Sequence, residues 1–312
     1  MQAFLDIVLP IFAIVGVGYA CGKLRLLGPS SSEALNGFVY WVALPALMFQ
    51  VMAGVDLAKI YNPAFIIGFS GALAATWAIA GIVGMVLFRL TASEASMHGL
   101  NGAYPNSGYL GIPLAIAAFG DEAALPAIVA AIISVLSITL AIIPIEISRQ
   151  EKSQIFKVIG KIILAVITNP MLVAPFAALV WAATGLGLAE PVEKFTGILG
   201  AAAGPCALFA IGLFLVGKPI TEGSFEVGLI TFAKLIMHPV LTGFALIVLF
   251  PTEPLWAAVG ILLAALPIGS GPFVLAQAQG VYVRRTSTAM LVTTTLSVVT
   301  VSAFFLVFPA AP

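Results

Sequence analysis

Long apolar runs recur from one end of the chain to the other, and each has the length of a helix that crosses a membrane. A hydrocarbon core ~30 Å thick needs about 20 residues of α-helix. The mean hydropathy of +1.15 and the charged fraction of 8% agree with this assignment, and no run shows the ~10-residue alternation of a barrel strand. We predict an all-α integral membrane protein with ten transmembrane helices, over residues 4–22, 35–53, 64–88, 97–119, 124–147, 162–184, 195–216, 227–250, 255–277 and 289–308.

The distribution of lysine and arginine between the loops predicts the orientation in the membrane, because positively charged loops stay in the cytoplasm. The loops after odd-numbered helices hold ten of the 13 basic residues, the opposite loops hold Lys59 and Lys194, and Lys234 lies within a helix. This bias places both termini on the non-cytoplasmic side of a multi-pass protein. The formal net charge of zero and the lack of a basic arm argue against a nucleic acid partner.

Two of the predicted helices, the fourth and the ninth, are interrupted by proline and glycine at membrane depth. The fourth contains YPNSGYLGIP over residues 104–113, and the ninth contains ALPIGSGPF over residues 265–273. Proline removes an amide hydrogen, and glycine tolerates backbone angles that other residues avoid. Polar backbone groups freed in this way are tolerated in lipid only where protein or a water-filled cavity receives them. The breaks therefore predict a binding site, and the alternative is a pair of kinks that only shape helix packing.

Weak self-similarity at an offset near 160 residues relates the two halves of the chain. It pairs Pro10 with Pro170, Pro45 with Pro205, Gly111 with Gly271, and Gly120 with Gly280. Because each half holds five helices, an odd number, the second half must be inserted upside down relative to the first. Such inverted repeats are typical of secondary transporters, whose sites lie near the midplane where broken helices meet. We predict a first repeat over residues 1–150 and a second over residues 151–312.

The chemistry of the two breaks favours an anion. Each break leaves a half-helix N-terminus, whose free amides and positive dipole end attract negative charge. Side-chain donors for a carboxylate come from Asn106, Ser107 and Ser270, and Tyr109 lies where its ring could stack on a substrate. The predicted substrate-binding residues are Pro105, Asn106, Ser107, Gly108, Tyr109, Pro267, Gly269, Ser270 and Gly271.

The residues at both breaks resemble those of the auxin efflux carrier family, which includes the plant PIN-formed auxin transporters. The resemblance rests on Pro105-Asn106-Ser107 and Gly111-Ile112-Pro113-Leu114 in the fourth helix, and on Leu266-Pro267-Ile268-Gly269 and Pro272-Phe273-Val274-Leu275-Ala276 in the ninth. It covers nearly the whole chain. Because the chain lacks the long central loop of the longer plant members, it is similar to the compact bacterial branch.

The resemblance implies crossed, broken helices 4 and 9 within two inverted five-helix repeats. It also implies a scaffold of helices 1, 2, 6 and 7, and a transport domain of helices 3–5 and 8–10. The family implies an organic anion carrier of the cell inner membrane that forms a homodimer through the scaffold. Pro105 and Pro267 would be the crossover prolines, and Asn106 would contact the substrate carboxylate. The expected substrates are malonate, malate or an auxin-like acid.

A coupling ion, H⁺ or Na⁺, needs ionisable or oxygen-rich groups inside the bundle. Lys234 and His238 share one face of the eighth helix, and a histidine can titrate in the physiological range. The competing and favoured interpretation is that His238 hydrogen-bonds a neighbour while Lys234 snorkels towards the cytoplasm. Gln277 offers an oxygen to sodium or substrate, although a hydrogen bond at the helix end is the simpler role. Glu226 lies near a helix end, where a solvated or snorkelling charge is expected rather than a proton relay.

Alternating access by a secondary carrier is therefore the predicted function, with an anion channel as the main competing class. An intramembrane enzyme is disfavoured because the chain contains no His-Glu-x-x-His, no Gly-x-Ser-x-Gly and no Asp-rich metal cluster. We expect no catalytic residue, no metal and no other cofactor. The expected partners are the organic anion, the lipid bilayer and a second copy of the chain.

Overall fold

The computed structural model describes residues 8–55, 60–149, 160, 163–164, 166–217 and 224–309. Within these residues the regular elements are helices, and the one β pairing is an isolated antiparallel bridge between Pro105 and Ile268. The elements are α1 (Leu9–Lys23), α2 (Pro29–Phe38), η2 (Val39–Ala43), α3 (Leu44–Ala53), α5 (Pro63–Phe88), α6 (Ala92–Ala103), η3 (Ser107–Gly111), α7 (Ile112–Phe119), η4 (Asp121–Ala123), α8 (Ala124–Arg149), α10 (Pro170–Ala182), α11 (Glu190–Ala201), α12 (Ala203–Leu215), α13 (Ser224–Phe232), η5 (Ala233–Met237), α14 (His238–Phe244), η6 (Ala245–Leu249), α15 (Pro254–Ala264), α16 (Ser270–Gln279) and α17 (Val283–Val307).

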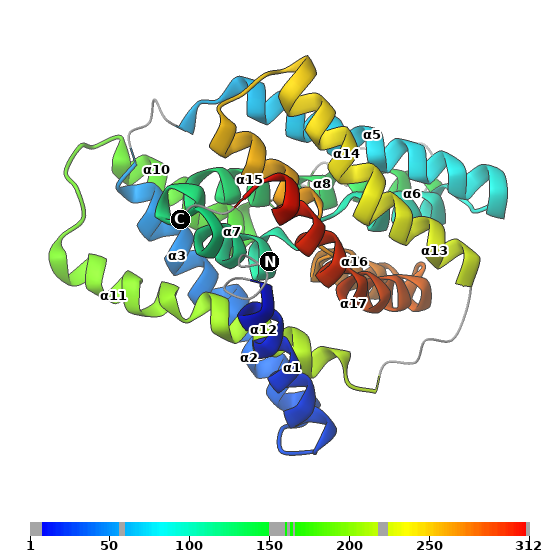
Figure 1. Ribbon diagram of the computed structural model, residues 1–312, viewed down its shortest axis with the longest axis horizontal. Helices are drawn as coiled ribbons and strands as arrows, with labels where there is room; N and C mark the ends of the chain where they lie inside the picture. Colours follow the sequence, from blue (N-terminus) through cyan, green and yellow to red (C-terminus); the bar gives the residue numbers. More distant parts are fainter. Residues whose placement is uncertain are drawn as a thin grey trace.

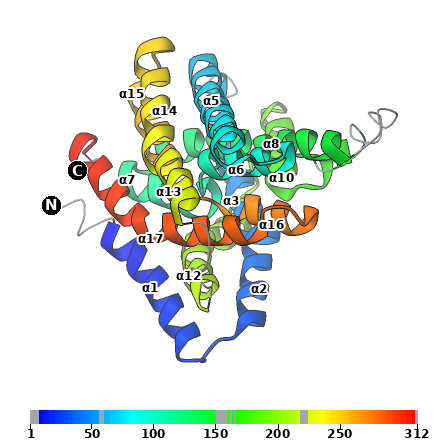
Figure 2. The same ribbon diagram turned by 90° about the vertical axis from the view of Figure 1, so that its right-hand side faces the viewer.

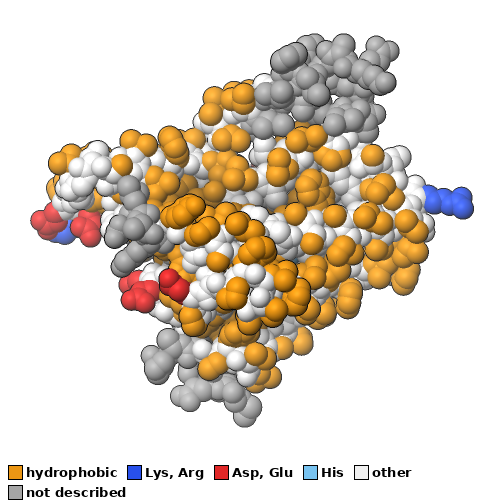
Figure 3. Space-filling view, turned by 90° about the horizontal axis from the view of Figure 1, so that it is seen from above, with side chains coloured by type: hydrophobic (Ala, Val, Ile, Leu, Met, Phe, Trp, Pro, Cys, Tyr) orange, Lys and Arg blue, Asp and Glu red, His pale blue; other side chains and the backbone are white. Residues whose placement is uncertain are grey.

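Six helical stretches are long and apolar enough to cross a membrane, and four shorter apolar helices accompany them. The six cover Pro29–Ala53, Pro63–Phe88, Asp121–Ile145, Glu190–Leu215, Phe225–Leu249 and Val283–Val307, and the shorter ones cover Leu9–Lys23, Ser107–Phe119, Pro170–Ala182 and Pro254–Ala264. Hydrophobic side chains spread over the face in Figure 3, with few charged side chains among them. Length, composition and surface agree with the predicted all-helical, multi-pass membrane protein.

Several helices begin earlier than the apolar runs that predicted them. The second begins at Pro29 rather than at residue 35, and the fourth begins at Ala92 rather than at residue 97. A capping box starts the fourth helix: the Thr91 hydroxyl accepts from the Glu94 amide, and the Glu94 carboxylate accepts from the Thr91 amide. The predicted helices are too short because hydropathy detects only the apolar part of a helix. The first turn is polar and is stabilised by the N-terminal cap. The predicted starts at residues 4 and 162, and Lys59, lie outside the described residues.

The π-helical segments η2, η3 and η5 lie just before prolines through which the helix continues. The segments η2, η3 and η5 are each followed, at the second residue beyond their ends, by Pro45, Pro113 or Pro239. A proline cannot donate to the carbonyl four residues earlier, and the residue before it donates five residues back instead, as His238 does to Ala233. The widened turn lets the helix continue through the proline, and such bulges are frequent at functional sites. In the stretch Phe225–Leu249 the bulge contains Lys234.

The helices pack in two groups, which lie to the lower left and to the upper right in Figure 1. In one group α1 packs against α12, and α3 packs against α10 and α11; in the other, α5 packs against α6 and α14, and α17 against α13 and α16. Gly18 and Gly212 allow α1 and α12 to approach closely, because a Cβ on Gly212 would lie 2.0 Å from the Val15 carbonyl oxygen. The segment η3, at the first break, contacts α12 of one group and α15 of the other. Figure 2 shows α1, α2 and α12 on one side of α16 and α17, with α5 and α14 on the opposite side.

Candidate functional site

The two predicted breaks touch each other. The backbone amide of Asn106 donates a hydrogen bond of 2.8 Å to the Pro267 carbonyl, beside the antiparallel bridge between Pro105 and Ile268. The backbones are so close that a Cβ on Gly269 would lie 3.1 Å from the Pro105 carbonyl oxygen and 3.2 Å from the Asn106 Cα. A side chain at residue 269 would therefore push the two segments apart by a few tenths of an ångström, and glycine lets them meet in this way.

A helix begins directly after the point where the two breaks meet, on each of the two chain segments. The stretch Ser107–Phe119 begins after Asn106, and α16 begins at Ser270 with Gly269 as its N-cap. The first amides of a helix have no acceptor within it, and they carry the positive end of the helix dipole. Both N-termini therefore present donors at the place where the segments meet.

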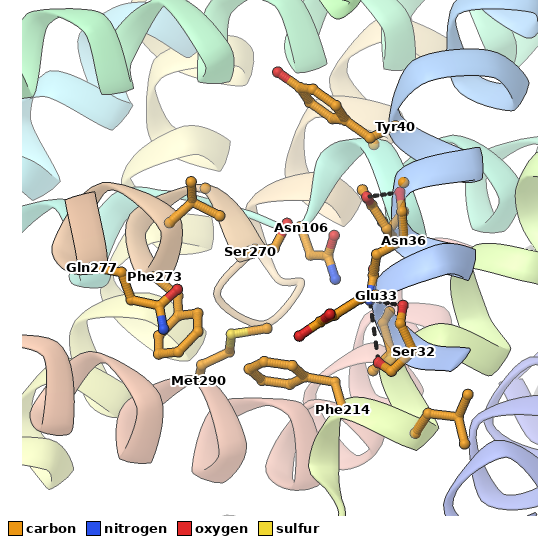
Figure 4. A pocket seen from close by; sticks show the side chains of 18 of the residues that line it. Ser32, Glu33, Asn36, Tyr40, Asn106, Phe214, Ser270, Phe273, Gln277 and Met290 are labelled. Atoms are coloured by element: carbon orange, nitrogen blue, oxygen red, sulfur yellow. Dashed lines mark hydrogen bonds between the residues drawn. The ribbon is translucent and has the colours of Figure 1, made fainter. Parts of the chain in front are cut away.

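A cavity of about 1140 Å³ opens beside this meeting point. Figure 4 shows it between α2, the two breaks and the helices α12, α16 and α17. Of the predicted residues, the cavity is lined by Pro105, Asn106, Ser107, Gly108, Tyr109, Gly269, Ser270, Gly271 and Gln277. Pro267, Lys234 and His238 are not among the lining residues. The structure thus gathers eight of the nine predicted substrate-binding residues, and Gln277, around one cavity.

The polar side chains at the first break have different surroundings. Asn106 directs its amide into the cavity (Figure 4). The Ser107 hydroxyl lies 3.3 Å from the Ser134 hydroxyl, and the Tyr109 hydroxyl donates to the Asn36 carbonyl at 3.3 Å. Ser107 and Tyr109 are therefore engaged in packing contacts. Asn106 is the residue of this break whose polar side chain faces the cavity most directly.

Lys234 differs from the favoured interpretation of its sequence position. Its side chain is fully buried and does not snorkel. Its ammonium donates to the Ala264 carbonyl at 2.6 Å, and Nζ lies 3.1 Å from His238 Nδ1. Ala264 is the last residue of α15, where the helix dipole presents its negative end. The hydrogen bond to the end of α15 satisfies the amine in the interior, so the side chain does not need to reach the membrane surface.

Glu226 is buried rather than solvated, contrary to its sequence-based expectation. Its carboxylate accepts a hydrogen bond from the Tyr282 hydroxyl and forms an ion pair of 2.5 Å with Arg285 Nε. Burial and the bond to Glu226 raise the pKa of the Tyr282 hydroxyl above its ordinary range. The cluster joins α13 to the start of α17. The ion pair with Arg285 and the hydrogen bond from Tyr282 therefore stabilise the Glu226 carboxylate away from water.

The stretch Pro29–Ala53 also contributes to the cavity, and nothing in the apolar pattern predicted this contribution. Ser32, Glu33 and Asn36 of α2 and Tyr40 of η2 line it opposite the breaks (Figure 4). Their helical spacing is the signal that could have found them, because Glu33, Asn36 and Tyr40 fall on one face at i, i+3 and i+7. Glu33 lies before residue 35, where the apolar run begins, and within the first turns of a helix that starts at Pro29.

A multi-pass helical protein in which two interrupted helices meet at a cavity has the construction of a membrane transporter. Residues 3–305 match the family described as "Membrane transport protein". The chain belongs to this family, which is the auxin efflux carrier family that its breaks resemble.

Three relatives carry names that describe them as transporters. A protein of Rhizobium meliloti (strain 1021) named "Putative malonate transporter" is 33% identical over 303 residues, which cover 97% of this chain and 95% of that protein. An "Uncharacterized transporter" of Methanothermobacter thermautotrophicus is 28% identical over 306 residues, covering 94% of this chain and 95% of the relative. The "Uncharacterized transporter YfdV" of Escherichia coli (strain K12) is 25% identical over 248 residues, or 76% of each chain.

Proposed function

We propose that the protein is a secondary transporter of small organic anions, with short carboxylates such as malonate or malate as its substrates. The observation that carries this proposal is the convergence of two helix N-termini and the Asn106 amide on one cavity wall. Backbone amides at helix N-termini stabilise a carboxylate without a basic side chain beside it. The malonate assignment of the Rhizobium relative supports a short carboxylate over an auxin-like acid.

The proposed topology has ten membrane-spanning helices in two inverted repeats, residues 1–150 and 151–312. The interruptions of the fourth and ninth spans and their mutual contact support it. The grouping of α1–α3 with α10–α12 supports a scaffold, and the grouping of α5–α8 with α13–α17 supports a transport domain. In this proposal the two groups move against each other and carry the crossover between the two sides of the membrane. The scaffold also forms a homodimer in the inner membrane.

The cavity faces the cytoplasm in this proposal. Arg25 and Leu27, which line it, belong to the loop after the first span, and the positive-inside bias assigns that loop to the cytoplasm. Both termini are then on the non-cytoplasmic side. We take H⁺ as the coupling ion, with Na⁺ as the competing outcome of the test below. Gln277, exposed at the cavity wall, presents an amide to the substrate.

A thermal-shift screen of the purified protein tests this function. The ligands are short mono- and dicarboxylates, each at two pH values and with or without sodium. A ligand that binds the native state raises the melting temperature as its concentration exceeds Kd. We expect stabilisation by a short carboxylate that does not require sodium. Stabilisation by uncharged or cationic solutes alone would contradict the assignment to organic anions.

A further inference from the structure

Glu33 extends into the cavity opposite the crossover. It lies in α2, whereas Asn106 and Ser270 belong to the two breaks. Figure 4 shows its carboxyl group reaching from α2 towards the cavity centre, below Asn106 and beside Phe214. A ligand held by Asn106 would therefore meet the Glu33 carboxyl group on its other side.

The carboxyl group of Glu33 has no fixed counter-charge in the described part of the chain. Among the described residues, none forms an ion pair or hydrogen bond with it. The charged residues of the described cavity lining are Arg25 and Glu33, and the other titratable groups there are the hydroxyls of Tyr40, Tyr104 and Tyr109. Glu33 is thus the one carboxyl group among the described residues that line the cavity.

An anion bound opposite an ionised carboxylate is repelled by it unless a proton is also bound. Two carboxylates within a few ångströms repel each other, and the usual resolution is that they share one proton. A short dicarboxylate suits this arrangement. One of its carboxylates takes the donors of the crossover, and its second carboxyl group faces Glu33.

We propose that Glu33 and the second carboxyl group of a short dicarboxylate share one proton, so that the site takes this class of substrate together with H⁺. This inference rests on the proposed function and specifies its substrate class and its coupling group. The proton comes from the water that fills the cavity, and one proton enters with each dianion. The bound complex then carries one negative charge at the helix N-termini, and a second one shared by Glu33 and the substrate carboxyl group, in place of the two charges that would face each other there without the proton.

Isothermal titration calorimetry with malonate tests this inference in the unmodified protein. Titrations near pH 7.5 in two buffers with different ionisation enthalpies give the number of protons taken up. We expect about one proton per malonate, and an apparent affinity that falls about tenfold per pH unit above neutrality. Binding without proton uptake would overturn the role of Glu33 while leaving the transporter assignment intact.

Glu33→Gln assigns the proton, because the amide keeps the shape and donates a hydrogen bond without a charge. We expect this variant to bind the dianion with no proton uptake and with an affinity that is flat across the same pH range. Glu33→Ala serves if the first variant does not fold, and Glu190→Gln on the exposed surface should take up one proton like the parent. One proton in both Glu33 variants would overturn the proposal. Absence of binding by any carboxylate in the unmodified protein would overturn the proposed function itself.

Discussion

The backbone amide of Asn106 is hydrogen-bonded to the carbonyl of Pro267 across 2.8 Å. This bond joins two segments that lie far apart in the sequence, and it leaves the Asn106 side chain free to enter the cavity. The same contact orients two helix N-termini towards one volume. The proposed binding site depends on this hydrogen bond, because neither break alone brings both helix N-termini to the cavity.

Replacing Asn106 by alanine removes the side-chain donor and retains the backbone bond to Pro267. A hydrogen bond to a charged group contributes about 1.5–3 kcal/mol, so malonate affinity should fall roughly 10- to 100-fold. Calorimetric Kd values measure the change, and size-exclusion chromatography checks the fold. Ser107→Ala is the matched control, because its hydroxyl contacts Ser134. Equal losses in both variants would argue against a specific role for the Asn106 amide.

Gly269→Ala should separate the two breaks. Its new Cβ would lie 2.7 Å from Tyr104 Cε1 and 3.1 Å from the Pro105 carbonyl oxygen, and the backbone atom cannot yield as a flexible side chain does. Overpacking of this kind costs about 1–3 kcal/mol. We expect a lower melting temperature and loss of malonate binding. Gly16→Ala, where nothing lies within 4 Å of the new Cβ, should change neither.

His238→Gln distinguishes the two roles proposed for the buried pair in η5 and α14. His238 and Lys234 lie outside the cavity lining, and Lys234 binds the end of α15, so we expect a structural role. The variant should lower the melting temperature and leave the pH profile of malonate uptake unchanged between about pH 5 and 8. A flattened profile would instead identify His238 as the coupling group.

Arg285→Leu tests the buried cluster at Glu226. The substitution leaves the Glu226 carboxylate buried without its cation. Breaking a fully buried pair costs about 3–5 kcal/mol, but Arg285 is 41% exposed, so a loss of roughly 1–2 kcal/mol is expected after solvent screening. Thermal unfolding measures it. Lys194→Leu breaks an exposed pair with Glu190 and should cost less than about 1 kcal/mol; an equal effect would contradict a special role for burial.

The sequence was most informative at its prolines and glycines. Pro105 and Pro267 mark the segments that interrupt the helices, because the missing amide hydrogen acts locally and is visible in the sequence. The helical content follows in the same way from the length of the apolar runs. Both features depend on neighbouring residues and need no knowledge of the fold.

Contacts between residues on different helices could not be predicted from the sequence. The inward turn of Lys234 depends on the Ala264 carbonyl, and the burial of Glu226 depends on Arg285; each partner lies on a different helix. The apolar run of the second predicted helix begins at residue 35, so hydropathy leaves out the polar first turns that contain Glu33. The charge of a side chain near a helix end therefore does not determine whether it faces water, a partner or a substrate.

Counterflow in proteoliposomes distinguishes a carrier with one alternating site from an anion channel. Vesicles loaded with unlabelled malonate and placed in a trace of labelled malonate report whether one alternating site exchanges substrate across the membrane. For a carrier we expect transient accumulation of label above its external concentration, and a much smaller overshoot with Asn106→Ala. Accumulation that only follows the electrochemical gradient, with no acceleration by internal malonate, would contradict a carrier and indicate an anion channel.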